Sequence, residues 1–177
     1  MLKLVKTYLN QEEKMKILIT YFTKSGNTEK VARAIYEVIG GTKEILPIKE
    51  VKNPDEYDII FCGFPVHSHS VPLPVQNFIK SIPSSKKLAF FVTHGSLRGG
   101  ELAVTAIEHA ISLASKLKLL GTFGCRGKVD PKIIETLLKQ PEHRAWAETA
   151  KSAASHPDES DLEDARHFAK KILTTPY

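Results

Sequence analysis

A turn with the sequence Thr23-Lys24-Ser25-Gly26-Asn27-Thr28 decides the fold of this chain. The turn joins an apolar run over residues 17–22 to an amphipathic segment that begins near Asn27. The first N–H groups of a helix have no partner within the helix, and they point at whatever occupies the turn before it. Hydroxyl side chains add donors, and Gly26 lets the backbone approach a ligand closely. The stretch therefore predicts a site for the phosphate group of a small molecule.

The bulk properties indicate one globular domain. The 177 residues are enough for a single domain with its own core. No apolar run approaches the ~18 residues of a membrane-spanning helix, and residues 1–14 lack the apolar core of a secretory signal. Cys62 and Cys125 lie in strand-like runs, which favours reduced core residues over a disulfide. We therefore expect a cytoplasmic protein with a domain over residues 15–177, preceded by an N-terminal extension over 1–14.

The charge of the chain is unevenly distributed. The net charge is +5, and residues 141–177 hold seven acids and five bases, so residues 1–140 carry +7. Such a surface attracts an acidic partner or an anionic cofactor. No basic helix or basic-aromatic stripe stands out, so nucleic acid is not expected as a partner. The oligomeric state is not indicated by the sequence.

Strand-like and helix-like segments alternate along the chain. Strands are expected at 16–22, 44–48, 57–62, 87–93 and 120–125, and helices at 27–39, 75–79, 101–118 and from about Ser160, where Ser160 and Glu163 have capping-box spacing. Pro47 indicates that the second strand lies at a sheet edge. The alternation predicts an α/β fold, a doubly wound five-stranded parallel sheet with helices on both faces. Right-handed crossovers favour the strand order 2-1-3-4-5.

Three loops are expected to meet at one edge of this sheet. Ligands of doubly wound sheets bind beyond the carboxyl ends of the strands, where the strand order reverses. The loops 23–28, 64–72 and 94–100 all leave strands at that edge. All three are rich in Ser, Thr, His and Gly. The sequence therefore predicts a polar binding rim made by these loops.

Several other phosphate-binding patterns are excluded. The first loop lacks the Gly-Lys-Ser/Thr ending of a Walker A motif, and no Gly-x-Gly-x-x-Gly fingerprint follows a strand. A receiver domain of the same topology requires acidic residues at the end of the first strand. Tyr21, Phe22 and Thr23 occupy that place. These absences disfavour nucleoside triphosphates, dinucleotides and receiver chemistry.

The remaining pattern resembles the phosphate loop of the flavodoxin family, which has the form Thr/Ser-x-Thr/Ser-Gly-x-Thr. The matching residues are Thr23, Ser25, Gly26 and Thr28. The resemblance extends over about residues 15–128 and the final helix. It includes the strand 57–63 with its continuation 64–66, and the strand end 91–95 with the Gly-rich turn after it. The implied fold is a flavodoxin-like three-layer sandwich.

The resemblance implies FMN as the cofactor. It places the phosphate at the first loop and the flavin ring between the other two. The implied cofactor-binding residues are Thr23, Lys24, Ser25, Gly26, Asn27 and Thr28 for the phosphate, and Pro65, Val66, His67, Ser68, Thr93, His94, Gly95, Ser96, Gly99 and Gly100 for the ring. Lys24 either pairs with the phosphate or points to solvent. The backbone N–H groups of 93–96 are candidate donors to the pyrimidine edge of the flavin.

The ring-flanking loops lack the usual aromatic residues. Family members often stack Trp or Tyr on the flavin, whereas these loops offer His67, His69 and His94. A histidine beside the ring would tune its reduction through protonation. This role is left open for His67 and His94, and a rim position without redox role is expected for His69. No carboxylate or cysteine accompanies the His-x-His pair, so no metal site is expected, and no catalytic residue is assigned.

Two further residues have expected roles outside the motif. Trp146, the only tryptophan, lies outside the three loops, so a packing role is expected. The segment around it, 141–158, is predicted to form a flap. Arg98 lies on the rim, where it either meets an anionic substrate or is solvated, as exposed arginines usually are.

Three functions remain open. The first is an FMN-binding, flavodoxin-like electron-transfer protein that exchanges electrons with a redox partner, which the basic balance suggests is acidic. The second is an FMN-dependent NAD(P)H oxidoreductase acting on quinones or similar acceptors. The third is a protein-binding module that has lost FMN. The fold cannot decide among them, but the lack of a separate nicotinamide-binding domain favours the carrier.

Overall fold

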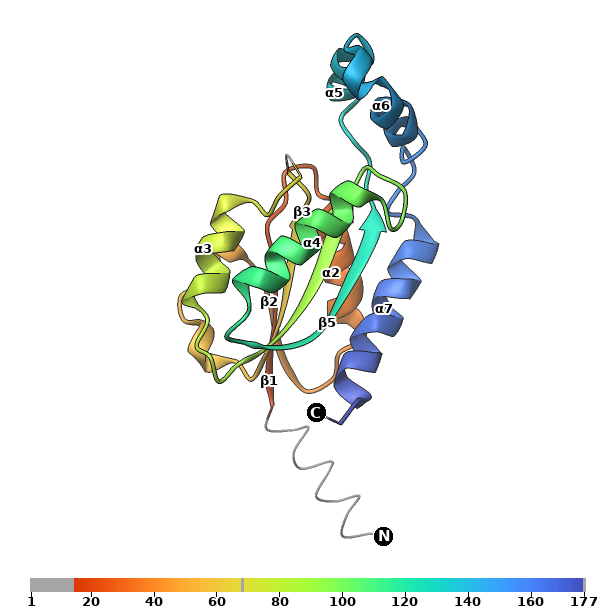
Figure 1. Ribbon diagram of the computed structural model, residues 1–177. Helices are drawn as coiled ribbons and strands as arrows, with labels where there is room; N and C mark the ends of the chain where they lie inside the picture. Colours follow the sequence, from red (N-terminus) through yellow and green to blue (C-terminus); the bar gives the residue numbers. More distant parts are fainter. Residues whose placement is uncertain (1–14, 68, 177) are drawn as a thin grey trace.

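The computed structural model describes residues 15–67 and 69–176 (Figure 1). The strands of this part are β1 (Lys16–Tyr21), β2 (Thr42–Pro47), β3 (Ile59–Pro65), β4 (Lys87–His94) and β5 (Lys118–Arg126). The helices are α2 (Asn27–Val38), α3 (Leu73–Ser81), α4 (Glu101–Leu113), α5 (Pro131–Leu138), α6 (Arg144–Lys151) and α7 (Glu159–Thr174), with 3-10 turns η1 (Ile48–Glu50), η2 (Pro54–Glu56) and η3 (Pro141–His143). The expected extension 1–14 and Ser68 lie outside the described residues.

The five strands form one parallel sheet in the order β2-β1-β3-β4-β5. The predicted strand order and fold class are therefore confirmed. β2 lies at an edge and ends at Pro47, where a residue without an N–H is tolerated. β1, β3 and β4 lie inside the sheet and are almost entirely buried, as parallel strands covered on both faces should be.

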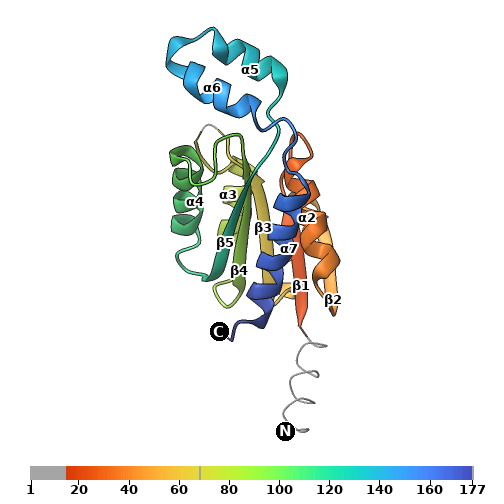
Figure 2. The same cartoon turned by 90° about the vertical axis from the view of Figure 1, so that its right-hand side faces the viewer.

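Helices cover both faces of the sheet (Figure 2). α2 and α7 pack on one face around Ile19, Ile35 and Phe61, and α3 and α4 pack on the other. Successive residues of a strand face opposite sides, so Phe61 enters the first layer while Ile60 enters the second. The ring of Phe168 on α7 meets Phe61 edge to face at 6.2 Å. The three-layer sandwich is thus built as the strand pattern predicts.

The α5–α6 hairpin, defined as residues 131–151, lies beyond the carboxyl ends of the strands (Figures 1 and 2). It is inserted between β5 and α7. Ile134, Ala147 and Ala150 form a small core of its own, against which Trp146 packs. The predicted flap over 141–158 is therefore half of a helical hairpin at the edge where ligands of this fold bind.

Several predicted boundaries were wrong. α3 spans Leu73–Ser81 rather than 75–79, and β3 spans Ile59–Pro65 rather than 57–62. α4 ends at Leu113 rather than at 118, because turn-type bonds at 114–117 lead directly into β5. α7 begins at Glu159, and its capping box is formed by Asp158 and Asp161 rather than Ser160 and Glu163. The Asp158 carboxylate accepts the N–H of Asp161 at 3.0 Å, and the Asp161 carboxylate accepts the N–H of Asp158 at 3.1 Å.

The two cysteines are buried and free, as expected of core residues. Burial raises the pKa of the Cys125 thiol to about 12 and raises that of Cys62 as well. Both thiols are therefore protonated at neutral pH. Among the described helices, none combines the length and apolar composition that crossing a bilayer requires.

Candidate functional site

The first loop presents a cluster of hydrogen-bond donors at the N-terminus of α2. Gly26 precedes the helix in the left-handed region, with φ of +85°, and its N–H donates to Oγ1 of Thr23 at 3.0 Å. Residues 24–26 are exposed. The N–H groups of residues 27–29 donate to no atom in the part of the chain that the structure describes. A left-handed turn with free N–H groups and hydroxyls is suited to an anion.

Thr28 is turned away from the solvent side of this loop. It is fully buried, and its hydroxyl lies 2.9 Å from that of Thr93 at the end of β4. Thr93 is only 2% exposed. The pair links the helix behind the first loop to the strand that leads into the third. The Thr28 side chain thus has a protein partner, while its backbone N–H has none in the described part of the chain.

Asn27 hydrogen-bonds to the segment after β5, a contact that the sequence did not predict. Its amide donates to the carbonyl oxygen of Lys128 at 2.9 Å. At Gly127, a Cβ would lie 2.8 Å from that amide nitrogen, so a side chain there would force the two apart. Lys30 donates to the carbonyl oxygen of Pro157 at 2.7 Å. The first turn of α2 therefore binds both stems of the α5–α6 hairpin, which are the segments that lead into and out of it at Lys128 and Pro157.

The second loop is closed by backbone bonds. The N–H of Val66 donates to the Thr93 carbonyl at 2.9 Å, so Pro65 and Val66 lie beside the end of β4. His67 and Ser70 exchange two backbone bonds of 3.0 and 2.9 Å, and His69 between them has φ of +63°. Ser68 lies outside the described residues. The Ser70 hydroxyl is 2.8 Å from Nδ1 of a histidine on α4, His109, which anchors the loop.

The third loop has free backbone donors. The N–H groups of Gly95, Ser96 and Leu97 donate to no atom within residues 15–67 and 69–176. The Ser96 carbonyl is occupied, because it accepts from Nδ1 of His94 at 3.1 Å. Gly99 has φ of +71°, which lets the loop turn back into α4 after Gly100.

Two histidines of the rim are neutral at neutral pH. Burial lowers the pKa of His94, and the charges of Arg126 and Arg98 lower it further. Burial and the nearby Lys24 lower the pKa of His67. No ion pair of Lys24 is found among the described residues, so its charge remains available beside the phosphate loop.

Arg98 is exposed, but its charge is paired. Its guanidinium contacts Asp161 at 3.2 Å and Asp164 at 2.6 Å, both at the start of α7. These contacts raise the pKa of Arg98, the bond to Asp164 most strongly. The expected solvent-exposed position is thus found, and the start of α7 in addition supplies two carboxylate partners that the sequence did not indicate.

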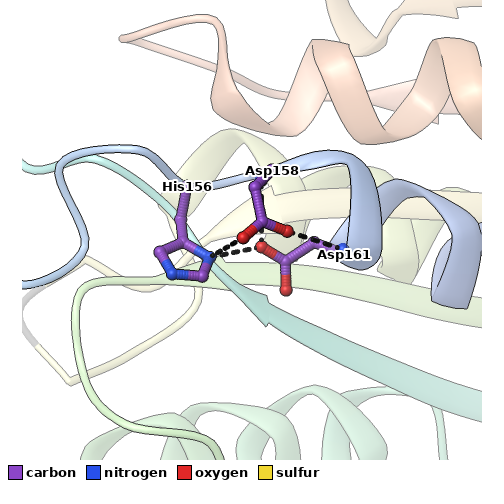
Figure 3. Close-up of side chains that lie close together, drawn as sticks. All are labelled: His156, Asp158 and Asp161. Carbon is purple, nitrogen blue, oxygen red and sulfur yellow. Dashed lines mark hydrogen bonds and ion pairs between the residues drawn. The ribbon is translucent and has the colours of Figure 1, made fainter.

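A group of one histidine and two carboxylates caps α7 (Figure 3). Nδ1 of His156 lies 2.5 Å from an oxygen of Asp161 and 3.7 Å from one of Asp158. Burial alone would raise the pKa of Asp161, but hydrogen bonds from His156, the Asp158 N–H and Arg98 outweigh it, and the net effect lowers that pKa. Both oxygens of Asp161 are already engaged by these donors. The geometry accounts for this group as a helix cap.

Trp146 contacts the third loop, which the sequence did not indicate. Its Nε1–H donates to Oγ of Ser96 at 3.1 Å, and a Cβ on Gly95 would lie 3.1 Å from its ring. Arg126, at the end of β5, donates from Nε to the Ser96 carbonyl at 3.2 Å. Its Nη2 donates to the carbonyl of Thr149 at 2.8 Å and to the hydroxyl of Ser152 at 2.9 Å. The only signal in the sequence was a single tryptophan in a segment that the fold does not need.

Comparison with known proteins identifies relatives over most of the chain. The model of a protein family described as flavodoxin domain matches residues 18–170. Over 171 residues, the chain is 31% identical to "Flavodoxin-like domain-containing protein BilS" of Clostridioides difficile (strain CD3). The alignment covers 90% of this chain and 97% of that relative.

Solved structures share the fold at lower identity. Flavodoxin 2 of Bacillus cereus is 20% identical, with a TM-score of 0.59 over 89% of this chain and 97% of that one. A flavoprotein of Lactobacillus acidophilus NCFM, solved in complex with FMN, is 20% identical, with a TM-score of 0.52 over 62% of this chain and 93% of that one. At such identities the likeness concerns the fold alone, a flavodoxin-like α/β sandwich.

Proposed function

The chain belongs to the flavodoxin family, and from that premise we propose that it binds FMN and works as an electron-transfer protein. One observation carries the proposal. Two sets of backbone N–H groups have no partner among the described residues. The set at 27–29 follows the carboxyl end of β1, and the set at 95–97 follows that of β4. Free donors at these two loops match a ligand with a phosphate and a ring rich in acceptors.

The first set suits the phosphate. The donors around it are N–H groups, the exposed hydroxyl of Ser25, the hydroxyl of Thr23 and the cation of Lys24. The Thr23 oxygen accepts one bond from Gly26, which leaves its O–H free to donate. We assign to Thr28 its backbone N–H, because its hydroxyl is buried against Thr93. Residues 23–28 contain no carboxylate that would repel a phosphate.

The second set suits the ring. FMN, when bound, supplies one- and two-electron redox chemistry. The chain contributes N–H groups of 95–97 as fixed donors and a neutral His94, whose Nδ1–H is already committed to Ser96. His67 is exposed on the facing loop and also neutral. Neutral histidines add no positive charge beside the ring at pH 7, so we expect the backbone donors to dominate its electrostatics.

A carrier is favoured over a self-sufficient reductase. Residues 15–176 are one sandwich with an inserted hairpin, and the described part contains no second domain for a nicotinamide cofactor. The +7 charge of residues 1–140 and the unpaired Lys24 support an acidic redox partner. Incubating the FMN-loaded protein alone with NAD(P)H and a quinone tests the alternative. We expect no steady oxidation, and sustained turnover would establish the reductase instead.

Ligand titration tests the proposal itself. Adding FMN or riboflavin to flavin-free protein, and following the loss of flavin fluorescence, gives both dissociation constants. Ser25→Ala removes one charge-assisted bond to the phosphate, about 1.5–3 kcal/mol or roughly 10- to 150-fold in Kd for FMN, and leaves riboflavin unaffected. Ser84→Ala, an exposed serine in the turn before β4, is the matched control. No quenching by either flavin would mean that the protein is a module without FMN.

A further inference from the structure

We propose that the α5–α6 hairpin is part of the cofactor site, with Trp146 and Arg126 as positioning residues that fix the third loop. This inference rests on the proposed FMN function. The hairpin touches both ends of the site, since its stems are held by α2 and its body is held by residues of the third loop. Its role would be to hold the N–H groups of 95–97 in the orientation that receives the ring.

Ser96 is the point at which the contacts converge. Its hydroxyl accepts from Trp146, and its carbonyl accepts from both His94 and Arg126. Ser96 is only 8% exposed, although Leu97 next to it is 57% exposed. Both oxygens of Ser96 therefore face protein, and its N–H is the group left over. A loop with glycines at 95, 99 and 100 has many accessible conformations, and these bonds select one of them.

Arg126 connects the loop to the hairpin. One side of its guanidinium binds the Ser96 carbonyl, and the other binds Thr149 and Ser152 at the C-terminal end of α6. A cation beside the carbonyls at the C-terminal end of a helix is stabilised by the helix dipole. The planar fork allows both contacts at once, which a lysine amine cannot reproduce. The hairpin and the loop are thus held as one unit.

Gly95 shows that the two surfaces are closely fitted. A Cβ at this position would lie 2.5 Å from a methyl of Val129, 3.1 Å from the ring of Trp146 and 3.6 Å from Ala150. Only a glycine lets the hairpin approach the loop so closely. The two ring-flanking loops carry no Trp or Tyr, and Trp146 of α6 contacts the third loop from outside.

Ring binding is the property to measure. Trp146→Phe keeps an aromatic ring but removes the donor to Ser96, and Arg126→Lys keeps the charge but removes the fork. Each variant should bind FMN and riboflavin more weakly by the same factor for both flavins, because riboflavin shares the ring but lacks the phosphate. That factor should be roughly three- to tenfold for the neutral hydrogen bond lost in Trp146→Phe, and at least as large for the charged donor changed in Arg126→Lys. Arg144→Lys is the control, since the one hydrogen bond of this α6 arginine among the described residues is to the Leu138 carbonyl of its own hairpin, at 3.4 Å.

Two further readouts separate positioning from loss of fold. Urea denaturation should show that each variant remains folded at the titration conditions. In the wild type, the fluorescence of Trp146 should be quenched when FMN binds, because the indole lies beside the third loop. The midpoint potential of bound FMN should become more negative in Trp146→Phe, since less rigid N–H donors favour the electron-rich form less. Unchanged ring binding in both variants, or a loss confined to FMN, would overturn the inference while the FMN function stands. Absence of FMN binding by the wild type would instead refute the proposed function.

Discussion

The buried pair of Thr28 and Thr93 allows a quantitative test of how the site is assembled. Thr28 is 0% exposed and Thr93 is 2% exposed, and the hydroxyl of each has only the other as its hydrogen-bond partner among the described residues. Thr28→Val replaces a hydroxyl by a methyl of similar size. It therefore leaves the Thr93 hydroxyl buried without a partner, which costs about 1–3 kcal/mol. Thr93→Val should cost the same for the same reason.

The double variant should be much more stable than the sum of the two changes indicates. With both hydroxyls replaced by methyls of the same shape, no buried polar group is left unsatisfied, and the cost should fall to between about 0 and 1 kcal/mol. Urea denaturation of the flavin-free protein measures all four members of this cycle. The coupling, which is the sum of the two single costs minus the cost of the double variant, should be about 1–6 kcal/mol. Additive effects of the two single changes would refute the view that the pair is satisfied only internally.

The same variants decide the role of Thr28 in ligand binding. If its hydroxyl contacts the phosphate, the double variant should lose FMN affinity while riboflavin affinity stays constant. Our assignment gives the phosphate only the N–H of this residue, which valine keeps. We therefore expect the double variant to bind FMN within roughly threefold of the wild type, less than the effect of one charge-assisted bond.

Three further predictions concern stability. Gly63→Ala places a Cβ 2.0 Å from a ring carbon of Phe91 on β4, and it should lower the free energy of unfolding in urea by about 3 kcal/mol. At Gly40 a Cβ would meet no atom within 4 Å, so Gly40→Ala should change that free energy by less than about 1 kcal/mol. Asp158→Ala should cost about 1 kcal/mol by loss of the α7 cap, and Ser160→Ala should cost almost nothing by the same measurement. His94 has a lowered pKa in the folded state, so its stabilising effect is complete above its ordinary value of 6.5 and is lost as the pH falls toward the lowered pKa. Stability measured between pH 7 and 5 should therefore decrease less in His94→Gln than in the wild type, and an identical decrease would contradict this.

The fold could be predicted because its signals are local. Apolar runs of strand length alternate with amphipathic segments, and the first turn supplies the N-terminus of α2. Parallel strands buried on both faces need no long-range information to be recognised. Handedness and short connections then leave few strand orders, and the observed one follows.

The start of α7 and the partners of Arg98 were not predicted, because tertiary contacts determine them. Both Ser160 and Asp158 are followed three residues later by an acid, so either could open α7 by local rules. The structure selects Asp158 because the acid three residues later, Asp161, is also held by His156 and Arg98. Arg98 lies 63 residues before Asp161, a separation that no local pattern can bridge.

The predicted phosphate loop rests on donors that lie within one loop, whereas the contacts of the third loop with the α5–α6 hairpin could not be predicted. Loop 23–28 contains the hydroxyls, the glycine and the helix N-terminus that a phosphate needs, so six consecutive residues predict their own role. Trp146 reaches Ser96 across 50 residues, through the placement of an inserted hairpin. Sequence reasoning found no aromatic residue in the ring-flanking loops and kept a flavin-free module open for that reason. The structure shows an aromatic residue packed against the outside of the third loop, where the absence of a Cβ at Gly95 makes room for it, and the flavin-free module stays an alternative that the titration with FMN decides.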